Sequence, residues 1–179
     1  RIASSYPIMK EFPVPVWGIH IDVKLINADM LPKDLVFVAG GEHKLVSSSI
    51  PSAESLFLDD FFIDKYEVSN ADFKIFIQAD GYLKKEYWKH KFKKDGKEIS
   101  WEEALKLLID RSNLPGPRNW VNQEYPEGKG NYPVTDISWY EAAAYAEFLG
   151  KTLPTVYQWE KAARNGVPNY HSTSMPWGL

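Results

Sequence analysis

Hydrophobic and polar positions divide the chain into short segments of differing periodicity. In the run WGIHIDVK at 17–24, apolar residues alternate with small or polar ones, which predicts a strand with prolines on its flanks. The run LVFVAGG at 35–41 predicts a short buried strand that ends in a Gly pair, and the Ser-rich stretch Glu42–Ser55 predicts an exposed loop. The run LFLDDFFIDKYEV at 56–68 predicts a further strand or a strand pair.

Four helices are predicted from the chemistry of their first turns. Each starts with Ser or Thr, followed three positions later by an acid or an amide, the spacing at which two side chains satisfy the unpaired backbone N–H groups of a helix start. The pairs are Ser69–Asp72, Ser100–Glu103, Ser138–Glu141 and Thr155–Gln158. The expected ends are Asp80-Gly81, Pro115-Gly116-Pro117, Gly150 and Asn165-Gly166.

Short strands, short helices and long loops alternate along the chain without an internal repeat. The longest predicted loop is the polar and aromatic segment 115–132. This order of elements favours an α+β fold over a layered α/β sheet. We expect residues 1–33 to be a linker or a first strand from a preceding region, and residues 34–179 to form one domain.

Composition makes the expected fold loop-rich and narrows the classes of partner. Aromatic residues make up 15% of the chain, beside 12 Pro and 11 Gly, so irregular backbone must pack many rings. The net charge of -3 argues against nucleic acid as a partner. The Lys-rich stretch 84–97 is a weak candidate for contact with an acidic partner, although a solvated basic surface is the commoner explanation. The sequence contains no run of 18 apolar residues, so no membrane span is predicted. It does not distinguish a location in the bacterial cytoplasm from one in the periplasm.

Candidate chemistry is sparse. The chain contains no Cys, which removes thiolate metal sites and cysteine catalysis from its own residues. His20 with Asp22, and Glu86 with His90 if helical, lack a third ligand at a suitable spacing, so surface histidines are expected. His43 and His171 are expected in loops.

Two adjacent carboxylate pairs, Asp59-Asp60 and Glu102-Glu103, have side chains that diverge on a strand or a helix. Glu102 and Glu103 suit the positive end of a helix dipole. We therefore predict no catalytic, cofactor-binding or metal-binding residue in this chain.

Residues 132–166, YPVTDISWYEAAAYAEFLGKTLPTVYQWEKAARNG, carry a long ordered series of motifs. They resemble the N-terminal portion of the formylglycine-generating-enzyme (sulfatase-modifying factor) family. FVAGG at 37–41, FFIDKYEVSN at 61–70 and Pro176-Trp177-Gly178 resemble further motifs of that family. The middle segment 81–104, with GPRNW at 116–120, resembles the branch attached to bacterial serine/threonine kinases.

The resemblance implies a loop-rich, C-type-lectin-like α+β fold, incomplete at its C-terminus. It also implies that active members convert a sulfatase Cys into formylglycine with oxygen and a copper-bound Cys pair, and that the copper and calcium segments lie after the Pro-Trp-Gly. We expect the matching motif residues to be structural, with Trp139 and Trp159 in the core and the charged ones in buried or half-buried ion pairs. These residues are Glu67, Asn70, Pro133, Ser138, Trp139, Pro154, Thr155, Trp159, Glu160 and Arg164.

Three hypotheses for function follow. The first is a non-catalytic binding, scaffold or sensory module of a larger bacterial regulatory protein, kinase-associated and contacting a protein or small ligand through its loops. The second is a fragment of a copper-dependent oxidoreductase that generates formylglycine, with its catalytic cysteines beyond Leu179. The third is a shortened domain that completes its core as a homo-oligomer.

Overall fold

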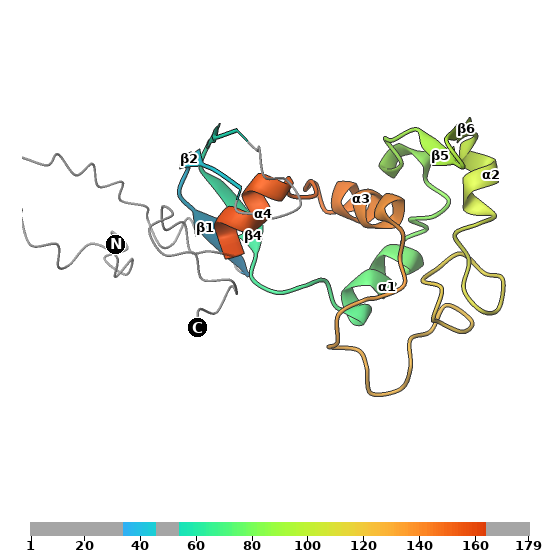
Figure 1. Ribbon diagram of the computed structural model, residues 1–179. Coiled ribbons are helices and arrows are strands. Elements are labelled where there is room, and N and C mark those ends of the chain that lie inside the picture. The colour runs from blue at the N-terminus through green and yellow to red at the C-terminus, as the bar shows by residue number, and fades with distance from the viewer. Residues whose placement is uncertain (1–33, 46–53, 164–179) are drawn as a thin grey trace, which may run out of the picture. The chain divides into compact units, whose positions relative to one another are not determined.

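The computed structural model describes residues 34–45 and 54–163, and the chain divides into two compact units (Figure 1). Among the described residues, one unit holds 34–45, 54–65 and 160–163, and the other holds Tyr66–Trp159. The predicted strand at 17–24, the predicted helix end at Asn165-Gly166, His171 and Arg164 lie outside the described residues.

The first unit contains two antiparallel strand pairs. β1 (Leu35–Val38) pairs with β4 (Phe61–Asp64), and β2 (Gly41–His43) pairs with β3 (Leu56–Leu58). The run at 56–68, expected to be a strand or a strand pair, thus forms two strands, each paired with an earlier segment rather than with the other. Gly40 connects β1 to β2 and donates its N–H to Asp60 Oδ1 at 2.8 Å. A Cβ at Gly40 would lie 2.4 Å from the Leu58 carbonyl oxygen, so the close approach of the two chain segments requires glycine.

One prediction for this unit is wrong. The segment predicted as an exposed loop from Glu42 begins with strand β2, and His43 and Leu45 are only 8% and 6% exposed. The pairing of β2 with β3 is a tertiary contact, and it overrides the weak local preference of the sequence Gly-Glu-His.

Each predicted helix begins directly after its capping residue. The helices are α1 (Asn70–Gln78), α2 (Trp101–Leu105), α3 (Trp139–Phe148) and α4 (Val156–Ala163). Ser69, Ser100 and Ser138 each accept a hydrogen bond from the backbone N–H three residues on, and Thr155 does the same with Gln158. α3 is followed by Gly150 in the left-handed conformation, as predicted. α2 is shorter than predicted, because the chain tightens into three-residue turns after Leu105.

The Lys-rich stretch forms a hairpin of β5 (Phe92–Lys94) and β6 (Lys97–Ile99). Asp95 and Gly96 at its tip have φ angles of 50° and 78°, as a two-residue hairpin turn requires. Glu86 lies in a single 3-10 turn at Lys85–Tyr87 that does not reach His90. Glu86 and His90 therefore do not share a helix, and His90 is exposed, as expected of a surface histidine.

Aromatic rings from distant segments form the core of the second unit. α1 and α3 lie side by side (Figure 1), and Phe73 of α1 stacks on Tyr145 of α3 with ring centroids 5.3 Å apart. Phe76 meets the same Tyr145 edge-on. Trp120, from the long predicted loop, is fully buried against Phe73. The loop is therefore held on the core by one large side chain, which gives the irregular backbone a fixed position.

Candidate functional site

A cavity of about 270 Å³ lies in the second unit, where the segment after α2 meets the start of α3. Its walls combine aliphatic side chains with two acids, one arginine and one hydroxyl. The lining residues are Leu107, Leu108, Ile109, Gly116, Arg118, Asp136, Ile137, Ser138 and Glu141. This mixture of apolar wall and a few polar groups is typical of small-molecule sites.

Backbone hydrogen bonds fix the two segments that form the walls. The Arg118 N–H donates to the Asp136 carbonyl at 3.0 Å, and the Gly116 N–H donates to the Leu108 carbonyl at 3.3 Å. Asp136 adopts a φ of 58°, a left-handed conformation that Asp and Asn tolerate better than most residues. The cavity therefore has preformed walls.

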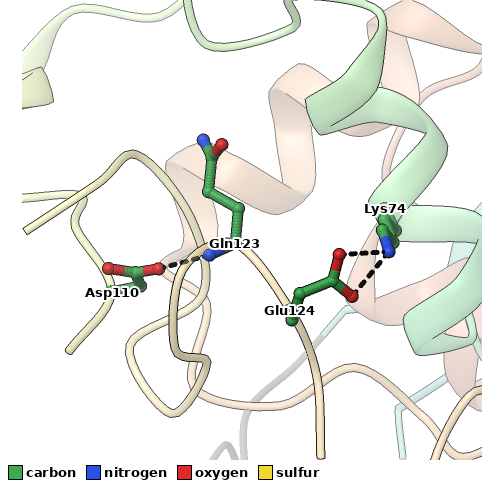
Figure 2. A network of polar contacts seen from close by, with 4 residues as sticks. All are labelled: Lys74, Asp110, Gln123 and Glu124. Carbon is green, nitrogen blue, oxygen red and sulfur yellow. Dashed lines mark hydrogen bonds and ion pairs between the residues drawn. The ribbon is translucent and has the colours of Figure 1, made fainter. Parts of the chain in front are cut away.

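Asp110 organises the loop that carries one of these walls. It is 4% exposed, and its carboxylate accepts three backbone N–H bonds. Oδ1 receives those of Ser112 at 2.7 Å and Leu114 at 3.0 Å, and Oδ2 receives that of Gln123 at 2.7 Å. Figure 2 shows the Asp110 contact with Gln123. A single buried carboxylate thus holds a loop that has no regular secondary structure.

Glu124, the residue after Gln123, ties the same loop to α1. Glu124 accepts hydrogen bonds from Lys74 Nζ on both carboxylate oxygens, each at 2.5 Å (Figure 2). The Glu124 side chain is largely exposed, so this ion pair contributes little stability compared with the Asp110 bonds.

Glu141 is the buried acid of the cavity. It is 3% exposed, accepts a hydrogen bond from the Tyr82 hydroxyl at 2.5 Å, and caps α3 by accepting from the Ser138 N–H at 2.6 Å. Burial raises the pKa of the Glu141 carboxyl, and the Tyr82 and Ser138 hydrogen bonds and the Arg118 charge only partly oppose that rise. Burial, together with the Glu141 charge, also raises the pKa of Tyr82.

The predicted motif residues are scattered, and of the nine that the structure describes, Ser138 alone lines the cavity. Asn70 donates through Nδ2 to the Lys129 carbonyl at 2.8 Å, and Pro133 faces Ser69 across an isolated β-bridge. Pro154 is exposed, and Thr155 caps α4. Glu160 is 8% exposed.

Three expectations about motif side chains are wrong. Trp139 and Trp159 are 56% and 58% exposed, so neither is a core ring within the described residues. Trp139 is the first residue of α3, where its indole contacts the rings of His90 and Tyr140 at the surface. Glu67 is exposed as well, and it makes no ion pair with another described residue.

Sequence reasoning missed most of this site. It identified Glu141 only as a helix cap and gave no role to Tyr82, Arg118 or Asp136. The Ser138–Glu141 spacing was the one available signal, and it reports local geometry rather than burial. Arg118 and Asp136 come together through loop hydrogen bonds that no periodicity encodes.

The residues present do not fit the family's copper chemistry. A copper–thiolate centre needs soft sulfur ligands, and the chain has no Cys. Across residues 34–45 and 54–163, no group of three His, Asp or Glu side chains is arranged to hold a metal ion. Within the same ranges, no helix is long and apolar enough to cross a membrane.

Comparison with known proteins gives a consistent picture. The family described as sulfatase-modifying factor enzyme 1-like domain matches residues 24–178. The mouse formylglycine-generating enzyme is 35% identical over 138 residues, which cover 70% of this chain and 36% of the mouse protein. The formylglycine-generating enzyme of Thermomonospora curvata is 28% identical over 184 residues, 88% of this chain and 56% of that protein.

A second type of relative is named as a kinase. Serine/threonine-protein kinase Pkn1 of Chlamydia trachomatis is 26% identical over 158 residues, which cover 86% of this chain and 23% of Pkn1. The chain thus spans from about a quarter to a little over half the length of these relatives. Its mixed helices, small sheets and long loops agree with the loop-rich α+β, C-type-lectin-like fold of the family. On this evidence, the chain belongs to the family of sulfatase-modifying factor enzyme 1-like domains.

Proposed function

We propose that this domain is a non-catalytic recognition module of a larger bacterial regulatory protein, and that it binds a small ligand through the cavity beside α3. The observation that carries the proposal is the preformed cavity, with its fixed walls and its charges of both signs. Loops held on a rigid core are well suited to recognition.

The kinase-named relatives support the modular part of the proposal. In Pkn1 of Chlamydia trachomatis the matching region covers 23% of the protein, so the domain is a minor part of a longer chain there. The absence of Cys from this chain supports the non-catalytic part, since its own residues cannot supply the family's thiols.

The second candidate is part of a formylglycine-generating oxidoreductase. The 35% identity to the mouse enzyme favours it. In that case the cysteines would come from outside these 179 residues, and the described domain would serve as framework for them.

A conversion assay separates the two candidates. The full-length protein is incubated with copper, oxygen and a peptide carrying a sulfatase-type Cys, and mass spectrometry detects formylglycine. The mouse enzyme is the positive control. Our proposal expects no conversion, whereas copper-dependent conversion would establish the oxidoreductase.

Recognition is tested separately with a ligand library. Ligand-observed NMR identifies small molecules that bind the full-length protein, and each one is then measured against the Arg118→Trp variant, which replaces a lining residue of the cavity with a bulky ring. Ligands that bind the wild-type protein but not the variant would support recognition at this site. A library that binds both proteins alike would contradict it.

A further inference from the structure

We propose that the cavity ligand is a small zwitterion with a short aliphatic chain, of the chemical class of a free aliphatic amino acid. This inference rests on the proposed recognition function and specifies its ligand. Three features of the cavity lead to it: a buried acid, an exposed arginine that makes no ion pair with another described residue, and aliphatic walls.

The acidic side of the cavity suits an ammonium group. Glu141 is 3% exposed, and among the described residues no Lys, Arg or His comes within ion-pair distance of it. The charge of Arg118 offsets the burial of the Glu141 carboxylate only in part, so a ligand ammonium would stabilise that carboxylate further. Asp136 supplies a second, solvent-exposed acid on the same cavity.

The basic side suits a carboxylate. Arg118 lines the same cavity, and its side chain makes no ion pair with another described residue. A guanidinium group binds a carboxylate through two parallel N–H bonds, a geometry that an isolated point charge does not offer. The Arg118 backbone is held by its bond to Asp136, so the side chain starts from a fixed position.

The remaining wall is aliphatic. Leu107, Leu108, Ile109 and Ile137 form this wall, beside Gly116 and Ser138, and the volume of about 270 Å³ has room for a small organic molecule. The two acids disfavour a phosphate or a simple anion, and a simple cation would leave the arginine without a charged partner in the ligand. A molecule with both charges and a branched alkyl chain satisfies all three parts of the wall.

The first test compares three compounds that share one alkyl chain. Isothermal titration of the full-length protein uses L-leucine, 3-methylbutylamine, which lacks the carboxylate, and 4-methylpentanoate, which lacks the ammonium. We expect leucine to bind at least about tenfold more tightly than either analogue, because each analogue leaves one charged group of the cavity unpaired. Equal affinity for all three, or no binding of leucine, would overturn the proposal.

The second test assigns each charge to its partner. In Arg118→Gln, leucine should no longer bind more tightly than 3-methylbutylamine. In Glu141→Gln, leucine should no longer bind more tightly than 4-methylpentanoate, while the Gln side chain preserves the helix cap. Glu103→Gln, the same change in the capping pair of α2, is the matched control and should leave leucine affinity unchanged. If Glu141→Gln fails to fold, Asp136→Asn tests the acidic side, since Asn also tolerates a positive φ.

Failure of this inference is distinguishable from failure of the recognition function. If leucine does not bind while other library ligands lose binding in Arg118→Trp, the zwitterion inference is overturned and recognition at the cavity stands. If the full-length protein converts the Cys peptide, the non-catalytic function fails whatever the result with leucine.

Discussion

The sequence Ser-Trp-x-Glu occurs twice, at 100–103 and at 138–141, and the two copies form the same local structure in different surroundings. Both are complete capping boxes: the Ser side chain accepts from the Glu N–H, and the Glu side chain accepts from the Ser N–H. Glu103 is exposed, whereas Glu141 is buried beside Tyr82 and the cavity. The difference lies entirely in what surrounds each acid.

The pKa values of the two acids are shifted in opposite directions as a result. Hydrogen bonds from Ser100 lower the pKa of Glu103, because they stabilise its charged form in a position that water still reaches. Burial raises the pKa of Glu141 although it accepts equivalent bonds. A capping motif therefore determines where a helix starts, while the tertiary environment determines the charge chemistry of the capping acid.

The largest expected difference between the two boxes comes from removing the acids. Glu141→Ala would leave the Tyr82 hydroxyl and the Ser138 N–H without their buried acceptor, so we expect a loss of about 3 kcal/mol in the free energy of unfolding. Glu103→Ala should produce a much smaller change, since water replaces the lost contact. Urea denaturation of both variants measures this, and equal losses would show that the surroundings of Glu141 do not matter.

A smaller effect is expected from the partner that only one box has. Tyr82→Phe removes the hydroxyl that donates to Glu141 and should cost about 1–2 kcal/mol. Because that bond lowers the pKa of Glu141, its loss should also raise this pKa further. Carbon-13 NMR titration of the Glu141 carboxyl follows the change. A pKa that stays constant would contradict the assigned hydrogen bond.

The serines should behave alike in both boxes. Ser100→Ala and Ser138→Ala each remove one N-cap acceptor, and we expect each to cost about 1 kcal/mol of stability. Thermal and urea denaturation of the pair provide the measurement. If the stability losses of the two Ser→Ala variants differed as much as those of the two Glu→Ala variants, burial would act on the whole capping box rather than on the acid.

The smallest expected effects are in the pH dependence of stability, with opposite signs. The folded pKa of Glu141 lies above its ordinary value of 4.5, so the folded state holds its proton more tightly and stability falls as pH rises from about 4.5 through the folded pKa. The folded pKa of Glu103 lies below 4.5, so its contribution is present above 4.5 and is lost as pH falls through that pKa. The free energy of unfolding is measured against pH for both variants. The fall in stability above pH 4.5 should be absent in Glu141→Gln, and the fall below pH 4.5 should be absent in Glu103→Gln.

Local signals predicted the framework well. The helix starts at Ser69, Ser100, Ser138 and Thr155 depend on hydrogen bonds three residues apart, which the sequence displays directly. The same holds for the left-handed stop at Gly150.

Features that depend on distant partners could not be predicted in this way. Strand β2 exists because it pairs with β3, and Trp139 is exposed although its motif predicted a core ring. The cavity requires Arg118 and Asp136 to meet through backbone bonds between two loops, a contact that no local pattern in one sequence contains.

The three N–H bonds of Asp110 have a consequence for how this surface can change over time. Because one buried carboxylate holds Ser112, Leu114 and Gln123 through their backbone atoms, the loop's path does not depend on most of its own side chains. Exposed positions such as Arg111 and Val121 can accept substitutions while the wall of the cavity keeps its shape. The loop thus combines a backbone path fixed by Asp110 with freedom to vary its exposed side chains, so a new specificity can arise there without a new fold.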